Sequence, residues 1–206
     1  MTTLYLLRHG ESTMNVKAKE LVGGRSNHAH LTEKGMAQAY HAGEWFKAQH
    51  IIPDIVMSSP ATRTIETAQQ ALRGMGLHSA ITLDDRLQEL SQGSMEGKTR
   101  ADVWNDEALT RLQLAPMDFA HPGGETFRDV QRRMKEWYSD TVEQFPDNTI
   151  LVTAHGLATR ALVGLLLDWD HAGIISATTD NCSLTKITYA ENSDTVECVG
   201  KTIISL

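Results

Sequence analysis

Short apolar runs alternate along the chain with longer stretches in which apolar residues recur every three or four positions. The short runs predict buried strands, and the recurring pattern predicts helices that bury one face. Strands are expected at 4–7, 54–57, 81–83, 149–153, 183–189 and 195–204, and helices at 32–46, from 59 onward, and at 101–114, 126–145 and 157–167. This alternation predicts an α/β fold, a three-layer sandwich with a mostly parallel central sheet and helices on both faces.

Helix-start signals define three of the expected boundaries. Thr32 and Ser59 are expected N-caps, because short hydroxyl side chains satisfy the free N–H groups of a first helical turn. Pro60, directly after Ser59, favours a first helical position. Thr126 and Asp129 have the spacing of a capping box.

Composition limits the size and the partners of the fold. With 206 residues, 41% of them hydrophobic, the chain can bury one good core, and we expect a single domain over residues 1–206. The formal charge of -7 argues against nucleic acid as a partner, although a local group of arginines can still bind a small anion. Arg132, Arg133 and Lys135 form one small basic cluster, expected on a solvated helix face. The sequence leaves open whether the chain forms a homo-oligomer.

Cysteine usage and the N-terminal pattern bear on the compartment. Cys182 and Cys198 lack metal-ligand or C-x-x-C spacing, and a disulfide framework is not expected at this chain length. The first residues show no basic leader followed by a long apolar stretch. The longest apolar run, 161–167, is too short to cross a bilayer. We therefore expect a cytoplasmic protein without a membrane partner.

Basic and imidazole side chains follow three of the predicted strands. Arg8 and His9 come directly after the first strand, and Arg63 lies near the start of the helix after the second. His155 and Gly156 stand between a later strand and its helix. Ligands of open α/β sheets bind outside the carboxyl ends of the strands, so these separated residues can converge at one edge.

These residue types suit a phosphoryl ligand, but each also has a plainer interpretation. Arginine binds phosphate oxygens through two parallel hydrogen bonds, a neutral imidazole can be a covalent nucleophile, and a helix start attracts anions. Taken singly, Arg8 and His9 fit a surface loop. Arg63 fits an ion pair with Glu66, and His155 fits a capping or core histidine.

Six short motifs are spread over residues 6–156. They are LLRHGESTMN (6–15), LTEKGMAQA (31–39), SSPATRTIETA (58–68), LQE (87–89), GGET (123–126) and VTAHG (152–156). Together and in this order they resemble the histidine phosphatase superfamily, the branch that includes phosphoglycerate mutase and many small-molecule phosphatases. The resemblance implies a phosphoglycerate mutase-like sandwich and a small phosphorylated metabolite as substrate.

The resemblance also implies a role for each candidate residue. His9 would attack phosphorus, and Glu89 would be the general acid. The groups that would hold the phosphoryl oxygens or face the bound phosphate are Arg8, Asn15, Arg63, His155 and Gly156. Fixed cationic donors can balance the charge of a phosphoryl group, so no metal or other cofactor is expected.

Other titratable side chains compete for these roles. Glu11 and Glu96 are rival carboxylates for the acid, with Glu96 expected on the surface. His28 and His30 alternate in the sequence, but no cluster of acidic or cysteine residues accompanies them. A substrate-facing loop is therefore favoured over a metal site.

Two long segments, 11–31 and 90–125, are expected to face the substrate. In the second, Leu90 and Gln92 occupy the places where mutases of the family carry an arginine and a tyrosine that would grip phosphoglycerate. This segment also offers few residues for a large additional cover.

These observations favour a metal-independent phosphomonoesterase that works through a phosphohistidine at His9. One alternative is a phosphoglycerate mutase that uses the same residues. Another is a non-catalytic phosphate-ligand binding protein of the same fold, but such a protein has no need of Glu89 together with His9.

Overall fold

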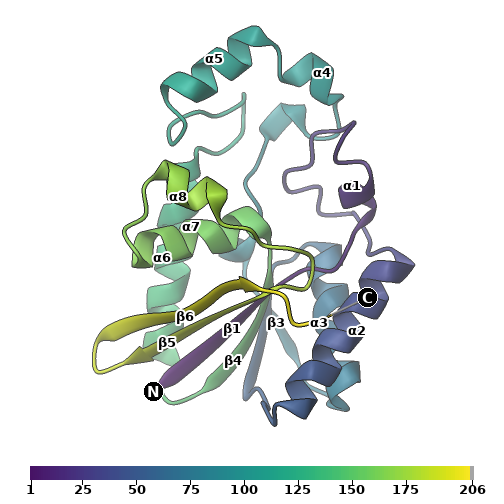
Figure 1. The fold of residues 1–206 in the computed structure, drawn as a ribbon, viewed down its shortest axis with the longest axis vertical. Helices are drawn as coiled ribbons and strands as arrows, with labels where there is room; N and C mark the ends of the chain where they lie inside the picture. Colours follow the sequence, from purple (N-terminus) through teal and green to yellow (C-terminus); the bar gives the residue numbers. More distant parts are fainter. Residues whose placement is uncertain (205–206) are drawn as a thin grey trace.

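A six-stranded mixed sheet forms the centre of the computed structural model, which describes residues 1–204 (Figure 1). The strands lie in the order β3-β2-β4-β1-β5-β6. The first four run parallel, whereas β5 is antiparallel to both of its neighbours. Their bounds are β1 (Thr2–Arg8), β2 (Ile55–Ser58), β3 (Ile81–Leu83), β4 (Thr149–Ala154), β5 (Leu184–Ala190) and β6 (Ser193–Lys201). This sheet confirms the predicted α/β fold with a mostly parallel centre.

Helices connect the strands and end close to their expected boundaries. The longer ones are α2 (Glu33–Ala48), α3 (Thr62–Met75), α6 (Phe127–Gln144) and α7 (Gly156–Leu166). The shorter ones are α1 (Thr13–Val16), α4 (Arg100–Val103), α5 (Asp106–Leu114) and α8 (His171–Ser176), with 3-10 turns η1 (Asp85–Leu87) and η2 (Gly93–Met95). Thr32 caps α2, and Thr126 with Asp129 forms the capping box of α6, as predicted. Among the helices described, none is long and apolar enough to span a membrane.

The start of α3 differs from its prediction. Its N-cap is Ala61, and the helix begins at Thr62 rather than at Pro60. Ser59 lies outside the helix, with its hydroxyl 2.9 Å from Nε2 of His155. The hydroxyl that the sequence pattern assigns to helix capping therefore contacts a buried imidazole instead.

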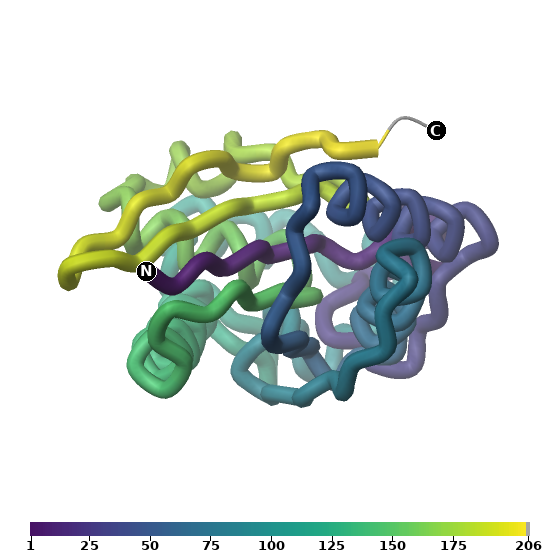
Figure 2. The backbone as a smooth tube through the Cα atoms, turned by 90° about the horizontal axis from the view of Figure 1, so that it is seen from below, coloured from purple at the N-terminus to yellow at the C-terminus, as the bar shows by residue number. Residues whose placement is uncertain are grey.

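Both faces of the sheet are covered, because successive residues of a strand point to opposite sides. Leu4 and Leu6 of β1 pack with side chains of α6 and α7, such as Trp137. Tyr5 and Leu7 pack on the other face with side chains of α2 and α3. The β5–β6 hairpin, yellow in Figure 2, lies along one edge. Helices on both faces confirm the predicted three-layer arrangement.

Residues 90–125, expected to face the substrate, contain the turn η2 and the helices α4 and α5. The helices α4 and α5 lie at the end of the molecule beyond the carboxyl ends of the parallel strands (Figure 1). Trp104, Phe119 and His121 pack together there, with ring centroids 4.9 to 5.9 Å apart. The single helix expected at 101–114 is divided in two, because Asn105 leaves the helix and caps α5.

Candidate active site

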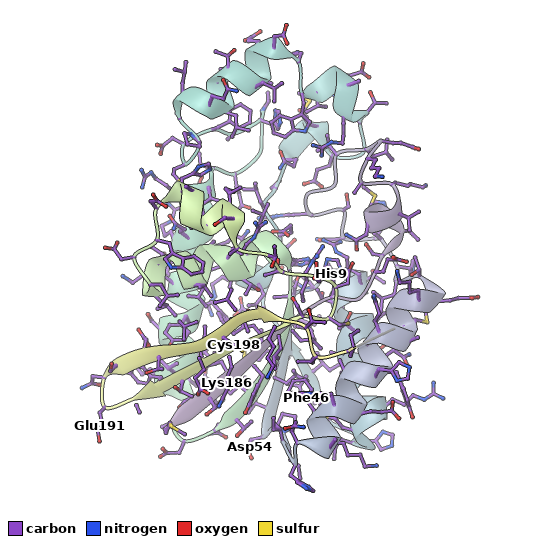
Figure 3. The ribbon with its side chains drawn as sticks, in the orientation of Figure 1. His9, Phe46, Asp54, Lys186, Glu191 and Cys198 are labelled. Carbon is purple, nitrogen blue, oxygen red and sulfur yellow. The ribbon has the colours of Figure 1, made fainter. Side chains whose placement is uncertain are left out.

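The parallel neighbours β1 and β4 bring two candidate histidines together. Arg8 is in register with Ala154, so His9 and His155 leave the sheet side by side. Their ring centroids are 5.3 Å apart, and both side chains are buried. Figure 3 shows His9 near the ends of the strands, between the sheet and the α4–α5 segment.

The imidazole of His9 is held in one tautomer. Its Nδ1 lies 2.8 Å from the carbonyl oxygen of Gly10, which can only accept, so Nδ1 carries the proton and Nε2 keeps its lone pair. Burial lowers the pKa of His9 well below its ordinary value, and the charges of Arg63 and Arg8 lower it further. Near neutral pH the ring is therefore uncharged, with an unprotonated Nε2.

His155 lies between a cation and a hydroxyl group. Nη2 of Arg63 is 3.1 Å from its Nδ1, and a guanidinium can only donate, so the proton of His155 is on Nε2 and is donated to Oγ of Ser59. Burial, and next the charge of Arg63, lower the pKa of His155 well below its ordinary value. Ser59 thus belongs to the site, although its sequence context indicated only a helix cap.

Arg63 lies in the first turn of α3 with only 3% of its surface exposed. Its Nη1 donates to the carbonyl oxygens of Arg25 at 2.8 Å and Ser26 at 3.0 Å. The alternative ion pair with Glu66 is wrong, since that carboxylate binds His30 at 2.6 Å. Arg63 therefore contacts both His155 and the first of the segments expected to face the substrate.

Arg8 and Asn15 meet the loop that precedes β5. Nη1 of Arg8 donates to the carbonyl oxygen of Thr179 at 2.5 Å. Its Nε is buried and finds no hydrogen-bond acceptor within residues 1–204. The amide of Asn181 donates to the carbonyl oxygen of His9 at 3.0 Å and to Oδ1 of Asn15 at 3.3 Å. A buried donor without an acceptor beside His9 is expected of a site that binds an anion.

The carboxylate of Glu89 lies at the start of α7. It accepts the backbone N–H groups of Leu157 and Ala158, both at 3.2 Å, in the place that anions take at helix N-termini. A Cβ on Gly156, the first residue of the helix, would lie 2.9 Å from Oγ1 of Thr179, and Nε of Arg8 lies 3.4 Å from the same position. Glu89 and Arg8 therefore flank the same helix end.

Glu89 lies close enough to Arg8 and Arg63 for its charge to affect the pKa values of both. The pKa values of Arg8 and Arg63 are lowered, because burial strips water from both guanidinium groups. The negative charge of Glu89 partly offsets this effect at both residues. The site is thus a cluster of two cations, two neutral imidazoles and one carboxylate.

The rival carboxylates have other partners. Glu11 binds Oγ1 of Thr32 at 2.9 Å and Nζ of Lys34 at 3.2 Å, at the start of α2. Glu96 is half-buried, which corrects its expected surface position. Its carboxylate accepts the backbone N–H groups of Arg25 and Ser26, each at 3.1 Å. Glu96 therefore joins the two segments expected to face the substrate.

A cavity of about 520 Å³ lies between these two segments. Lys17, Arg25 and His28 line one side of it, and Ser91 and Glu96 line the other. It adjoins the histidine cluster, because the residue Ser26 in its wall also binds Arg63.

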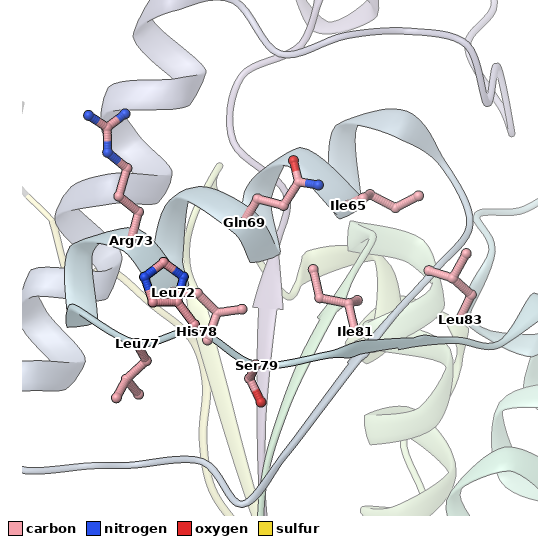
Figure 4. A pocket seen from close by; sticks show the side chains of 9 residues that line it. All are labelled: Ile65, Gln69, Leu72, Arg73, Leu77, His78, Ser79, Ile81 and Leu83. Atoms are coloured by element: carbon pink, nitrogen blue, oxygen red, sulfur yellow. The ribbon is translucent and has the colours of Figure 1, made fainter.

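A second hollow of the same volume lies between α3 and β3 (Figure 4). Apolar side chains such as Ile65, Leu72 and Ile81 line it, and none of the candidate site residues does. It is a separate surface feature.

His28 and His30 are not part of a metal-binding cluster. Within residues 1–204, no group of three or more histidine, cysteine, aspartate or glutamate side chains is placed to hold a metal ion. His30 pairs with Glu66, and His28 is exposed beside the cavity.

The sequence interpretation of Arg133 is wrong. Arg132 is 68% exposed, as expected, but the Arg133 side chain is only 12% exposed. Arg133 donates to the carbonyl oxygens of Gln88 at 2.7 Å and Glu89 at 3.2 Å. Its spacing from the buried Trp137 places it at the edge of the apolar stripe of α6, and this spacing was the signal available in the sequence.

Residues 4–202 match the sequence profile of the histidine phosphatase superfamily (branch 1). The chain belongs to the histidine phosphatase superfamily. Among curated members of the superfamily, it is 33% identical over 203 residues to a 2,3-bisphosphoglycerate-dependent phosphoglycerate mutase of Rhodococcus opacus. That match covers 84% of this chain and 80% of the mutase.

Solved structures of histidine phosphatases share the fold over nearly the whole chain. Bacillus stearothermophilus YhfR is 30% identical with a TM-score of 0.87, and the match covers 98% of both chains. A mycobacterial glucosyl-3-phosphoglycerate phosphatase is 25% identical with a TM-score of 0.81, covering 97% of this chain and 99% of that one. The superfamily relatives thus include both mutases and phosphatases.

The two buried neutral histidines make the stability of the folded chain depend on pH. Because His9 and His155 stay neutral in the folded state, the unfolded chain binds more protons once the pH falls below about 6.5. We expect the free energy of unfolding to fall by roughly 1 kcal/mol per pH unit for each histidine below that pH. Urea unfolding at about pH 7.5 and about pH 5.5 measures this loss.

A double variant, His9→Asn with His155→Asn, should lose less stability between the two pH values than the wild type. The control pair is His50→Asn with His78→Asn, which replaces two exposed histidines and should keep the wild-type loss. If His9→Asn with His155→Asn loses as much unfolding free energy between the two pH values as the wild type, the two histidines are not buried in the neutral form.

Proposed function

We propose that this histidine phosphatase is a phosphomonoesterase that hydrolyses small phosphate esters through a phosphohistidine at His9, without a metal ion. The observation that carries the proposal is the unprotonated Nε2 of His9, buried among Arg8, Arg63 and His155. The buried Nε of Arg8 supplies a donor that awaits an acceptor. At an effective dielectric of about 20, a cation and an oxyanion about 4 Å apart attract by roughly 4 kcal/mol before desolvation.

In the first step, Nε2 of His9 attacks phosphorus while the ester P–O bond breaks. Glu89 takes up a proton together with the anionic substrate and donates it to the departing alcohol oxygen, while the N–P bond forms. Arg8, Arg63 and His155 hold the remaining phosphoryl oxygens, so these oxygens replace the present contacts of Arg63 with backbone carbonyl groups and that of the His155 Nε2–H with Ser59. The proton on Nδ1 of His9 stays shared with the Gly10 carbonyl, which stabilises the charged ring.

In the second step, Glu89 takes a proton from water, and the water oxygen attacks phosphorus. The N–P bond breaks, inorganic phosphate leaves and His9 returns to its neutral form. Asn15 and the N-terminus of α7 at Gly156 face the phosphate in both steps. Asn181 supports this arrangement, because it joins Asn15 to the backbone of His9.

Hydrolysis is favoured over isomerisation by the side chain after the general acid. A mutase must hold its substrate while the phosphoryl group moves between two oxygens. Leu90 packs against the apolar core beside α6 and α7, so it offers no charge to a substrate acid group. The identity to phosphoglycerate mutases favours the isomerase as a second candidate, with the same His9 and Glu89.

We further propose that the alcohol part of the substrate enters the cavity of about 520 Å³ and carries a second acidic group. Lys17, Arg25 and His28 line the cavity, whereas the carboxylate of Glu96 is already bound to backbone N–H groups. Arg25 is paired with Glu125, and neutral N–H groups leave Glu96 its charge, so the positive charge offered to an acidic group is that of Lys17, which has no ion-pair partner among residues 1–204. The similarity to a glucosyl-3-phosphoglycerate phosphatase supports an acidic ester.

Product analysis separates the two candidate activities. We expect purified protein to release inorganic phosphate from 3-phosphoglycerate much faster than it forms 2-phosphoglycerate. His9→Ala should lower phosphate release by at least about a thousandfold, because no other group replaces the nucleophile. Faster interconversion of the two isomers than release of phosphate would overturn the phosphatase assignment.

The charge of the cavity is tested with two substrates that differ in one acidic group, 3-phosphoglycerate and glycerol 3-phosphate. We expect a higher kcat/KM for the acidic ester. Lys17→Met should reduce this preference by about three- to fivefold, the size of an exposed ion pair. Lys19→Met removes a nearby exposed charge outside the cavity wall and should leave the preference unchanged. If Lys17→Met and Lys19→Met show the same ratio of kcat/KM for the two substrates, the acidic-ester proposal is wrong.

A further inference from the structure

Arg133 of α6 is a largely buried cation whose donors converge on the segment around Glu89. Its Nη1 donates to the carbonyl oxygens of Arg86 at 2.6 Å and Gln88 at 2.7 Å. Its Nη2 donates to the carbonyl oxygen of Glu89 itself at 3.2 Å. One side chain thus fixes three backbone groups within four residues.

The segment that Arg133 binds lies outside the regular sheet and helices. Glu89 stands between the turns η1 and η2. Its carboxylate is held by a different element, the N-terminus of α7. Arg133 on the backbone and α7 on the carboxylate therefore define the position of Glu89 from two sides.

Glu125 fixes the orientation of the Arg133 guanidinium. Its two carboxylate oxygens accept Nε at 2.9 Å and Nη2 at 3.1 Å, the paired geometry that suits arginine and that lysine lacks. Burial alone would raise the pKa of Glu125, but hydrogen bonds from Arg133 and from the backbone of Ser91 lower it. The pair is therefore ionised, and both partners are held in place.

The same carboxylate extends the network to the other side of the site. Nη2 of Arg25 lies 3.1 Å from Oε1 of Glu125, and the carbonyl oxygen of Arg25 accepts Nη1 of Arg63. The contacts thus run without a break from the phosphate-binding candidate Arg63 to the backbone of Glu89. A rigid network of this kind sets the distance between the phosphoryl group and the acid.

We propose that Arg133 is the positioning residue of Glu89, holding its carboxyl group where it can protonate the leaving oxygen, with Glu125 and Arg25 joining it to Arg63. This role rests on the proposed function, because it presumes that Glu89 is the general acid. Arg133 itself acts only through the backbone. If the buried ion pair of Arg133 had only a structural role, replacing Arg133 would lower the stability of the protein and slow the reaction of all substrates equally.

Two leaving groups distinguish positioning from stability. An alkoxide needs a proton from Glu89 to depart, whereas a nitrophenolate leaves without one. The quantity measured is the single-turnover rate ratio of an alkyl phosphate to nitrophenyl phosphate. Partial unfolding lowers both rates equally and leaves this ratio unchanged, so a destabilised variant still gives a result.

We expect Arg133→Lys and Arg133→Met to lower the ratio by about tenfold or more, since displacement of a catalytic group by an ångström costs up to about a hundredfold in rate. Arg132→Met, on the exposed side of the same helix, should keep the wild-type ratio. An unchanged ratio in both Arg133 variants overturns the positioning role.

Glu89→Gln separates failure of this inference from failure of the proposed function. We expect this variant to lower the ratio at least as far as the Arg133 variants do. If Glu89→Gln lowers the ratio and the Arg133 variants do not, Glu89 is the acid and only the positioning role is wrong. If Glu89→Gln leaves the ratio unchanged, the acid assignment fails, and the positioning role fails with it.

Discussion

The parallel pairing of β1 with β4 is the constraint on which the rest of the site depends. Because Arg8 is in register with Ala154, the residues that follow, His9 and His155, lie side by side, with their ring centroids 5.3 Å apart. The pairing is anchored by apolar residues on both faces of the sheet, among them Leu6 and Val152. The packing of the apolar core thereby fixes the positions of His9 and His155, which are not part of that core.

Burial gives these polar groups their chemical character. Burial of the two imidazoles is the main cause of their lowered pKa values, and the nearby guanidinium groups add to it, so both histidines stay neutral. Burying such charges is costly, and the structure compensates with carbonyl acceptors and with the carboxylate of Glu89. One donor, Nε of Arg8, is buried and left without an acceptor in the described part of the chain. A bound phosphoryl group would supply an acceptor for this donor, and its negative charge would balance the excess positive charge of the site.

Much of the fold and of the candidate site could be predicted from the sequence, because both are expressed in local patterns. Apolar runs located the strands, and the strand-end residues Arg8, His9 and His155 followed from them. The spacing of Arg133 from Trp137 indicates a partly buried position. The partners of Ser59 and Arg133 could not be assigned, because they are distant in sequence: Ser59 meets His155, and Arg133 meets the segment around Glu89. In the sequence, a hydroxyl residue before proline is as typical of a helix cap as of a contact with a buried histidine. A pair of basic residues is as typical of a solvated helix face as of a buried contact with backbone carbonyl groups. Residues 90–125 were also hard to predict, because few of their apolar side chains show one clear period.

A phosphoryl group bound covalently to the imidazole of His9 can be observed directly. The measurement is rapid acid-free quenching of the protein with substrate, followed by peptide mass spectrometry to locate the phosphoryl group. We predict a transient modification of His9 that is lost in acid, survives base and disappears as inorganic phosphate accumulates. Turnover without this species, or a phosphoryl group that forms on another residue and decays at the turnover rate, would contradict a phosphohistidine intermediate at His9.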